Sequence, residues 1–253
     1  MKKRLYILSP HFDDAIFSVG GIIDLWSSSF DTVTIINIFS ASSPPPEKLS
    51  PQAKLFHQRF KSNDPVEIRR RQDSDAFNCF EVKVIEFAEL DAIYRSYPIS
   101  NEPLYQNPID IFGSIHELDR QLIIDISRKL ESLNKYSENN LFLAPLSIGG
   151  HVDHEITRLS AEVSIQDQLL YYEDCPYAFQ KSLRHTYPEM IKNMNPYNVH
   201  LNSNHVNKKA QAISHYDSSI SVNSFIDYMK SHEKGQFIER LWCSQKFIGK
   251  IPN

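Results

Sequence analysis

Apolar residues in the first forty positions follow two periods in turn. Residues 4–8 form a short apolar run closed by Ser9-Pro10, which predicts a buried strand. Residues 32–41 (TVTIINIFSA) are rich in β-branched residues and predict a second buried strand. Between them, apolar residues recur at intervals of three and four, which predicts a helix over about 13–28. The residues on that helical face are Ile16, Val19, Ile22, Ile23 and Trp26. Strand, helix and strand in this order predict a βαβ unit and therefore a parallel sheet.

The rest of the chain continues the alternation of strands and helices. We predict helices over 66–79 and 115–134 and near 205–216, and strands over 82–87, 141–144 and 168–172. Two stretches, 42–65 with its five prolines and 91–114, lack periodicity, and connections of this length are usually functional. No shift in composition marks a boundary. We therefore expect one α/β domain over residues 1–253 with a mostly parallel sheet.

Composition narrows the function classes. With 41% apolar and 23% charged residues, the 253-residue chain has the balance of a globular protein. Its formal charge of −4 argues against nucleic-acid binding, and no apolar run approaches a membrane span or a secretory signal. Three cysteines far apart favour a reduced, cytoplasmic setting. Glycine fingerprints of dinucleotide or P-loop sites are missing from the sequence.

Two of the predicted strands end in clusters of histidine and aspartate. The strand at 4–8 is followed by HFDD at 11–14, and the strand at 141–144 is followed by HVDH at 151–154. Because the carboxyl ends of parallel strands open at one edge of the sheet, neighbouring strands would bring both clusters into one crevice.

Imidazoles and carboxylates without thiolates suit a catalytic divalent metal, most often zinc, which takes three protein ligands and leaves one position open. Five candidate groups (His11, Asp13, Asp14, His151 and His154) exceed that number, and the surplus suits acid–base chemistry. Each motif alone is also compatible with helix capping or a solvated surface. Two such motifs, each after a predicted strand, favour the metal site, although spacing does not say which aspartate binds the ion.

The segments SPHFDDAIFSVGGII and GGHVDHEITR resemble the PIG-L/LmbE-like family of zinc-dependent N-acetyl-sugar deacetylases. The hallmark of that family is a His-Pro-Asp-Asp motif followed much later by a His-x-Asp-His motif. Two further segments, RRRQDSDAF and YYEDCPYA, are softer matches. The resemblance implies a Rossmann-like fold with helices on both faces of the sheet, in agreement with the βαβ pattern.

The resemblance also implies roles for individual residues. One zinc ion per chain, with another divalent ion as the alternative, would be bound by His11, Asp14 and His154. Asp13 would be the general base that activates the water. His151 would stabilise the oxyanion and help to protonate the leaving amine, and Asp153 would orient His151.

Substrate contacts are also expected from the resemblance, which by position points to Arg69 and Asp91. Tyr172 and Tyr177 could form a wall for a sugar ring or pack in the core. The acids at 173–174 could line the same cleft or serve only as turn residues.

The sequence departs from the family pattern at several positions. Phe12 stands where proline is usual, Ala15 replaces an acidic residue, and Gln72 stands where glutamate is usual. Residues 147–150 also lack the tyrosine that some relatives use as an oxyanion contact.

The resemblance implies an enzyme that hydrolyses an N-acetyl group of an amino sugar, of the N-acetylglucosamine-conjugate type, to acetate and a free amine. The alternatives are a zinc amidohydrolase acting on another N-acyl compound, such as an antibiotic intermediate, and a catalytically silent sugar-binding relative. The intact Asp13 and His151 argue against the silent form. We expect a small-molecule substrate, no nucleic acid and no membrane insertion. The sugar, the native metal, the oligomeric state and the roles of 42–65 and 91–114 stay open.

Overall fold

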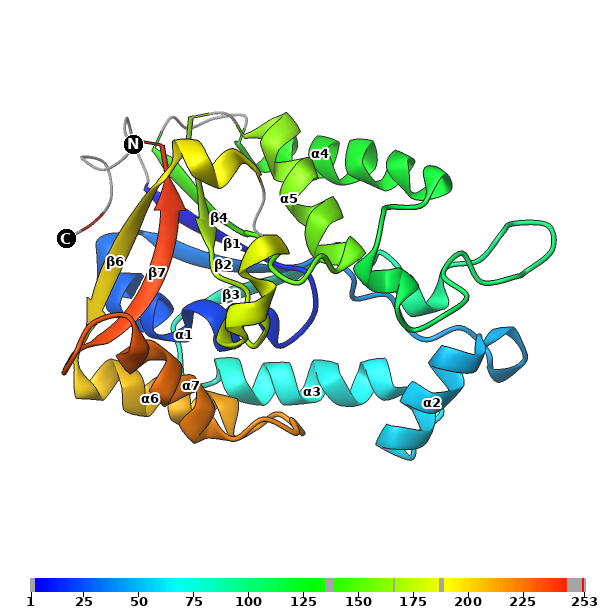
Figure 1. Cartoon of the computed structure of the whole chain (residues 1–253), viewed down its shortest axis with the longest axis horizontal. Coiled ribbons are helices and arrows are strands. Elements are labelled where there is room, and N and C mark those ends of the chain that lie inside the picture. Colours follow the sequence, from blue (N-terminus) through cyan, green and yellow to red (C-terminus); the bar gives the residue numbers. More distant parts are fainter. Residues whose placement is uncertain (1–2, 135–138, 166, 187–188, 245–251, 253) are drawn as a thin grey trace.

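A twisted sheet runs through the centre of the molecule (Figure 1). The computed structural model describes residues 3–134, 139–165, 167–186, 189–244 and 252. Within these residues the sheet has seven strands in the order β3-β2-β1-β4-β5-β7-β6. The strands are β1 (Arg4–Ser9), β2 (Thr32–Asn37), β3 (Lys83–Glu86), β4 (Asn140–Pro145), β5 (Leu169–Tyr172), β6 (Asn195–Leu201) and β7 (Phe237–Cys243). Strands β1 to β5 pair in parallel, whereas β7 is antiparallel to both of its neighbours.

Helices cover both faces of this sheet, as predicted. The helices are α1 (Asp14–Trp26), α2 (Pro51–Phe60), α3 (Pro65–Phe77), α4 (Arg120–Asn134), α5 (Val152–Ser164), α6 (Ser203–Ile213) and α7 (Val222–Ser231). Figure 1 shows α4 and α5 on one side of the sheet and α1, α3 and α6 on the other. No helix among the described residues is long and apolar enough to cross a membrane. The predicted α/β class with a mostly parallel sheet is confirmed.

Several predicted boundaries differ from the structure. The strand predicted over 32–41 ends at Asn37, although the N–H groups of Ile38 and Phe39 still bind the carbonyls of Ser9 and Pro10. The helix predicted over 115–134 begins only at Arg120, after a 3₁₀ turn at Glu117–Asp119.

Five helices and strands were not predicted by residue range, namely α2, α5, α7, β6 and β7. Helix α2 lies inside the proline-rich stretch 42–65, where the side chain of Ser50 accepts a hydrogen bond from the Ala53 N–H and Pro51 opens the helix.

Strands β1 and β4 are neighbours at the centre of the sheet. Their register pairs Arg4 with Asn140 and Ile7 with Leu143. On the other side of β1 lies β2, and on the other side of β4 lies β5, so the direction of strand order reverses between β1 and β4. Such a reversal opens a crevice at the carboxyl ends of the two strands. Both histidine–aspartate clusters begin at this point.

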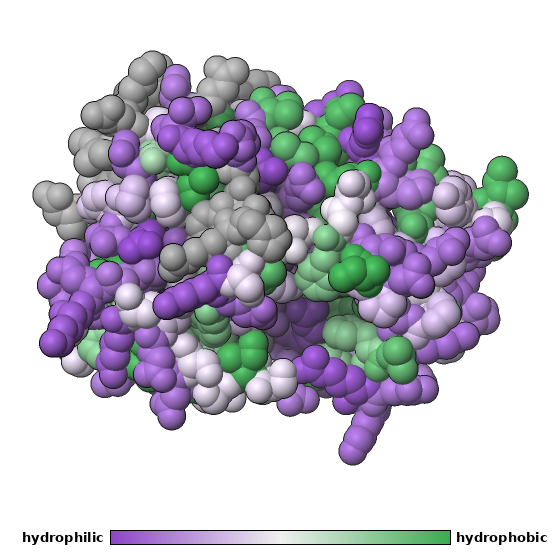
Figure 2. Space-filling model, in the orientation of Figure 1, coloured by the Kyte–Doolittle hydropathy of each residue, from purple (hydrophilic) through white to green (hydrophobic). Residues whose placement is uncertain are grey.

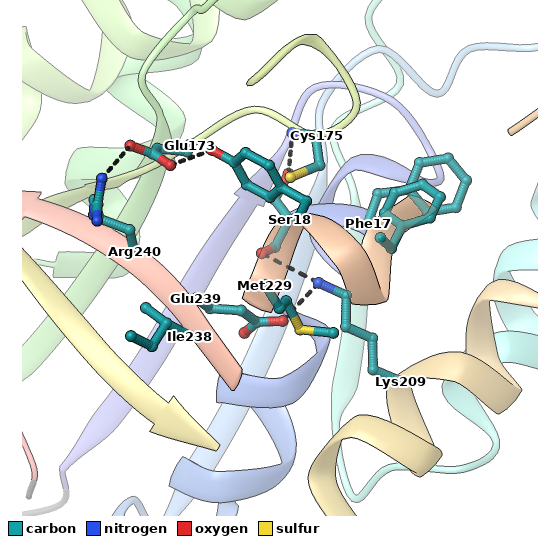
Figure 3. A pocket seen from close by; sticks show the side chains of 11 residues that line it. Phe17, Ser18, Glu173, Cys175, Lys209, Met229, Ile238, Glu239 and Arg240 are labelled. Atoms are coloured by element: carbon teal, nitrogen blue, oxygen red, sulfur yellow. Dashed lines mark hydrogen bonds and ion pairs between the residues drawn. The ribbon is translucent and has the colours of Figure 1, made fainter. Parts of the chain in front are cut away.

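A buried ion pair holds α1 in place (Figure 3). Val19 has non-helical backbone angles (φ −132°, ψ 23°), and this break frees N–H groups in the middle of α1. The Glu239 carboxylate from β7 accepts hydrogen bonds from the N–H groups of Gly21 (3.0 Å) and Ile22 (2.8 Å). Lys209 of α6 lies 2.6 Å from the same carboxylate, so that the charge is paired. The cavity beside this pair measures about 10 Å³, about the size that one water molecule needs. The pair thus joins α6 and β7 to the helix that carries Asp14.

Candidate active site

The first cluster lies in the tight connection between β1 and α1. The Ser9 hydroxyl donates to the His11 carbonyl (2.6 Å) and accepts from the Ala15 N–H (3.0 Å). The His11 N–H in turn donates to Oδ2 of Asp14 (2.8 Å). These local bonds fold the connection so that His11 and Asp14 face the same point.

The second cluster lies where the chain leaves β4 and enters α5. Ser147, Gly149 and Gly150 all have positive φ (67°, 88° and 72°), which turns the chain sharply before the helix. His151 is the N-cap of α5, and its Nδ1 accepts the N–H of Asp153 (3.2 Å). His154 lies on the first turn of the helix and points back toward β1.

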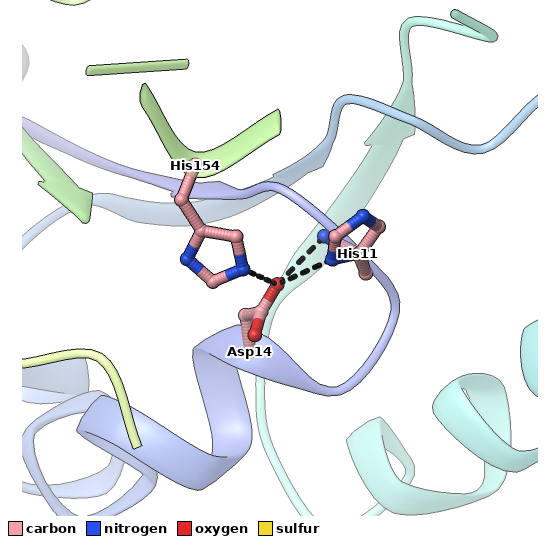
Figure 4. A group of neighbouring side chains, drawn as sticks. All are labelled: His11, Asp14 and His154. Atoms are coloured by element: carbon pink, nitrogen blue, oxygen red, sulfur yellow. Dashed lines mark hydrogen bonds and ion pairs between the residues drawn. The ribbon is translucent and has the colours of Figure 1, made fainter. Parts of the chain in front are cut away.

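Three of the predicted ligands meet at one place (Figure 4). Oδ2 of Asp14 lies 3.3 Å from Nδ1 of His11 and 3.3 Å from Nε2 of His154. The three potential ligand atoms lie within 4.8 Å of one another, and all three residues are buried. Nε2 of His154 is buried without a hydrogen-bond partner among the described residues. In the neutral ring this nitrogen offers a lone pair beside a carboxylate and a second imidazole, which fits a metal ligand, and the cluster suggests a metal site.

Negative charge surrounds these two histidines. Burial alone would lower the pKa of His11, but Asp14 and Asp153 outweigh it and raise that pKa well above its usual value. Burial opposes protonation of His154 as well, yet Asp14 and Asp174 raise its pKa to about 9. The site therefore stabilises positive charge, whether it is a proton or a divalent cation.

Asp174 fixes the orientation of His154 from behind. Its Oδ1 accepts a hydrogen bond from Nδ1 of His154 (2.6 Å), and its Oδ2 accepts one from the Ile148 N–H (3.0 Å). In the neutral ring this bond keeps the hydrogen on Nδ1, so that Nε2 presents a lone pair to the site. A carboxylate behind the histidine is the usual companion of a metal-binding imidazole. The sequence left Asp174 undecided between cleft and turn, and the structure assigns it this supporting contact.

The carboxylate of Asp153 does not contact His151 in the way that the resemblance implied. Its Oδ2 lies 3.0 Å from Nε2 of His11, and its Oδ1 lies 2.7 Å from the Arg95 guanidinium. The hydrogen bond to the His151 ring comes from the backbone N–H of Asp153 instead. The physical reason is that Asp153 lies on the first turn of α5. There its backbone N–H binds the ring of the N-cap residue His151, while its side chain reaches His11, which follows β1.

Asp13 lies beside the three ligands and faces the cleft. Its Oδ1 is 3.0 Å from the Arg69 guanidinium of α3, so the residue expected to bind substrate is paired with the expected base. Burial would lower the pKa of Arg69, but Asp13 and Asp91 raise it, and the guanidinium stays charged. Asp91 lies near Nε2 of His11 at 3.6 Å and lines the same cleft.

His151 is held in its neutral form. Burial lowers its pKa well below the usual value, and the nearby His11 and His154 lower it further against the opposing effect of Asp153. Since its Nδ1 accepts the Asp153 N–H, a neutral ring carries its hydrogen on Nε2. His151 can therefore donate a hydrogen bond without being charged.

These groups share an open cleft of about 540 Å³. Its floor is polar and includes His11, Asp13, Asp14, Asp91 and His151. Its walls include apolar side chains, namely Leu55, Phe56, Phe60, Ile111, Phe112 and Tyr177. Figure 2 shows this face of the molecule hollowed near its middle, with hydrophilic residues in the hollow and hydrophobic residues at its side. The volume is in the range of ordinary small-molecule sites.

The two tyrosines considered from the sequence have different surroundings. Tyr172 is fully buried and its hydroxyl donates to the Leu8 carbonyl (2.7 Å), so it is a core residue. Tyr177 lines the cleft, with its ring perpendicular to that of His154 at a centroid distance of 5.6 Å. A Cβ on Gly149 would lie 3.0 Å from the Tyr177 ring, so a glycine at this position leaves room for the tyrosine. Sequence reasoning alone could not separate the two roles.

No family model matches the chain. Among curated proteins, it is 26% identical over 193 residues to a 2'-N-acetylparomamine deacetylase of Niallia circulans, covering 70% of this chain and 68% of the relative. It is 25% identical over 187 residues to a 2'-N-acetylparomamine deacetylase of Streptomyces fradiae, covering 71% of this chain and 60% of the relative. Its fold is similar to the crystal structure of a deacetylase from the teicoplanin biosynthesis pathway, with a TM-score of 0.81 and 24% identity over 95% of this chain and 97% of that one.

These similarities agree with the α/β architecture and with the prediction of a hydrolytic enzyme, since both curated relatives are deacetylases. The chain matches about 60 to 70% of the length of these relatives. The substrate in their names is therefore a property of the relatives. The similarity to the solved structure agrees with the fold, the two curated relatives support an enzyme of the hydrolase class, and the buried cluster of His11, Asp14 and His154 suggests a metal site.

Proposed function

We propose that this protein is a metal-dependent hydrolase that removes the N-acetyl group of an amino sugar, of the N-acetylglucosamine-conjugate type, and releases acetate and a free amine. The observation that carries the proposal is the meeting of His11, Asp14 and His154 at the floor of an open cleft, with Asp13 beside them. The names of the two curated relatives support the N-acetyl amino sugar as substrate class.

Three atoms would hold the ion, namely Nδ1 of His11, an oxygen of Asp14 and Nε2 of His154. Two imidazoles and one carboxylate are a common donor set for catalytic zinc, and one zinc per chain is our assignment. When bound, the ion supplies Lewis acidity to the amide oxygen and to the attacking water.

Asp13 would accept the proton of that water. Its carboxylate faces the cleft next to the ligands, and the ion pair with Arg69 at 3.0 Å holds it in one orientation. A positioned carboxylate that takes a proton during attack is a general base, which contributes about 10²- to 10⁴-fold to the rate.

His151 would donate a hydrogen bond from Nε2 to the amide oxygen as negative charge develops there. Burial lowers the pKa of His151, so the neutral imidazole is the form that would donate this hydrogen bond. A neutral donor still stabilises an oxyanion, as known enzymes that use a neutral imidazole as electrophile show.

Arg69 and Asp91 would bind the sugar hydroxyls at the polar side of the cleft, and Tyr177 would form one wall of the sugar site. Asp91 lines the cleft, and its carboxylate can accept hydrogen bonds from hydroxyl groups. Arg69 has further donors beyond the one that binds Asp13.

The apolar wall favours a second candidate, an N-acylated compound larger than a simple sugar. Leu55, Phe56 and Phe60 from α2 line the same cleft as Ile111 and Phe112, and together they give it an apolar surface. An antibiotic intermediate with an apolar part would use this wall.

An amine-release assay tests the proposal. The protein is incubated with N-acetylated glucosamine conjugates and with longer N-acyl compounds, each with zinc, with another divalent ion and with a chelator. Release of amine from the N-acetyl sugars that stops with chelator supports the first function, and release only from the longer N-acyl compounds supports the second. Binding of a sugar without turnover under every metal condition refutes both.

A further inference from the structure

Arg95 is a buried arginine behind the metal site, on the irregular segment between β3 and α4. It is only 6% exposed, and its guanidinium lies between the rings of Phe39 (5.2 Å) and Tyr105 (5.5 Å). It is paired with two carboxylates, through Nε to Asp119 (3.0 Å) and through a terminal nitrogen to Asp153 (2.7 Å). The other terminal nitrogen donates to the Leu90 carbonyl (3.0 Å). A buried guanidinium with this many partners has a fixed position.

Asp153 connects this arginine to the metal site. Its side chain is completely buried, and each of its oxygens has a separate task. Oδ1 faces Arg95, whereas Oδ2 lies 3.0 Å from Nε2 of His11 and accepts the Ala92 N–H at 3.0 Å. The carboxylate therefore cannot turn without losing contacts on both sides.

The contact with Asp153 determines which nitrogen of His11 carries the hydrogen. An ionised carboxylate only accepts, so Nε2 of His11 must donate. In the neutral ring, Nδ1 then keeps a lone pair, and this is the atom that lies 3.3 Å from Asp14. The residue that orients the first histidine of the site is thus Asp153, and the residue that fixes Asp153 is Arg95.

We propose that Arg95 is a positioning residue for the metal centre: through Asp153 it fixes the ring and the tautomer of His11 and so sets the affinity for a divalent ion. The inference rests on the proposed metal-dependent function. It also assigns a task to part of the segment 91–114, which carries Arg95 and Tyr105 and whose continuation supplies Asp119. Tyr105 supports the chain of contacts, because its hydroxyl donates to Asp119 at 2.6 Å.

A second buried arginine offers a matched control. Arg158 of α5 is 8% exposed and is paired with Glu155 (3.7 Å) and Glu162 (2.8 Å) of the same helix. Its Nε also donates to the Ser147 hydroxyl (3.3 Å), and both of its ion pairs are with carboxylates of its own helix. Arg95 and Arg158 are thus alike in burial and in pairing with two carboxylates, but the carboxylates of Arg158 are Glu155 and Glu162, whereas one of those of Arg95 is Asp153.

The test compares Arg95→Lys with Arg158→Lys in the full chain after removal of metal by a chelator. Lysine keeps the charge but cannot contact two carboxylates with a planar fork. Zinc affinity is measured by competition with a chromophoric chelator, thermal unfolding is measured on the metal-free protein, and Co²⁺ is added to record its visible spectrum. We expect Arg95→Lys to weaken zinc binding by about 10- to 100-fold and to change the Co²⁺ spectrum. Arg158→Lys should lower the melting temperature and leave both metal readouts unchanged.

An Arg95→Lys variant that is folded and binds zinc as tightly as the wild type overturns the inference, and so does an equal loss of affinity in Arg158→Lys. Should Arg95→Lys not fold, Asp119→Asn replaces it, because loss of that charge releases Arg95 from its anchor on the far side and so leaves Asp153 less firmly fixed. Weaker zinc binding in Asp119→Asn supports the inference and unchanged binding overturns it. A wild type that binds no divalent ion and releases no amine refutes the proposed function itself, which separates the two failures.

Discussion

Replacing Asp174 with asparagine would remove one charge behind His154 while keeping the shape of the side chain. In the wild type, one oxygen accepts from Nδ1 of His154 at 2.6 Å and the other from the Ile148 N–H at 3.0 Å. Asparagine has only one acceptor oxygen, so it can keep only one of these two bonds.

Either orientation of the new amide has a cost. With its oxygen at His154, its NH₂ faces the N–H of Ile148, and opposing two buried donors costs about 1–3 kcal/mol. With its NH₂ at His154, the ring must accept at Nδ1 and carry its hydrogen on Nε2, the atom that would bind metal. We therefore expect zinc affinity to fall by about 10- to 100-fold, which corresponds to about 1.4–2.8 kcal/mol.

The assay is zinc titration of the metal-free protein against a competing chelator, with thermal unfolding in parallel. Glu173→Gln is the matched control, because the neighbouring carboxylate accepts from the Tyr228 hydroxyl and from Nε1 of Trp242 and does not contact His154. That variant should lose stability and keep its zinc affinity. A folded Asp174→Asn protein with wild-type zinc affinity would refute the reasoning about His154.

Three further changes test other parts of the site. Asp13→Asn should keep its metal and lose about 10²- to 10⁴-fold in kcat, whereas His154→Ala should lose the metal itself. Metal analysis and kinetics on both variants distinguish the two roles. Full activity of Asp13→Asn, or full metal loading of His154→Ala, would contradict the assignment. Gly149→Ala puts a Cβ 3.0 Å from the Tyr177 ring at a φ of +88° and should cost about 1–2 kcal/mol of stability and raise KM. Gly235→Ala, at φ +81° with nothing within 4 Å, should show the loss of stability without the change in KM, and equal KM values for the two variants would argue against Tyr177 as a wall. Since the pKa of His154 is raised to about 9, its contribution to the stability of the metal-free protein is complete below pH ~6.5 and is lost as the pH rises through 9. Zinc affinity should rise over the same pH range, because zinc displaces the proton. Melting curves with and without zinc measure both trends, and the opposite trends would contradict the charge balance described for the site.

The parts of the site that local sequence predicts are those that lie at strand ends. The adjacency of β1 and β4 brings HFDD and HVDH together, and a short apolar run followed by polar residues is visible without knowledge of the fold. The supporting residues could not be found in this way. Asp174 reaches His154 from the end of a different strand, and Arg95 lies in a segment without periodicity.

The missed secondary structure has related physical reasons. Strand β6 (NPYNVHL) alternates buried Val199 and Leu201 with exposed polar positions and contains a proline, so that it lacks the continuous apolar run of β1. Helix α2 buries only Ala53 and His57, too few positions for a helical period to stand out among the prolines around it. Edge and surface elements are specified by their neighbours more than by their own sequence.

The wide separation of the two clusters along the chain constrains when the centre can form during synthesis. His11 and Asp14 leave the ribosome early, but their counterpart His154 follows only after more than half of the polypeptide, and Asp174 later still. A nascent chain that has completed β1 and α1 thus offers two ligands to any ion in its surroundings and no third. On the proposed function, the ion would therefore bind late, after β4 has been inserted beside β1 and α5 has formed.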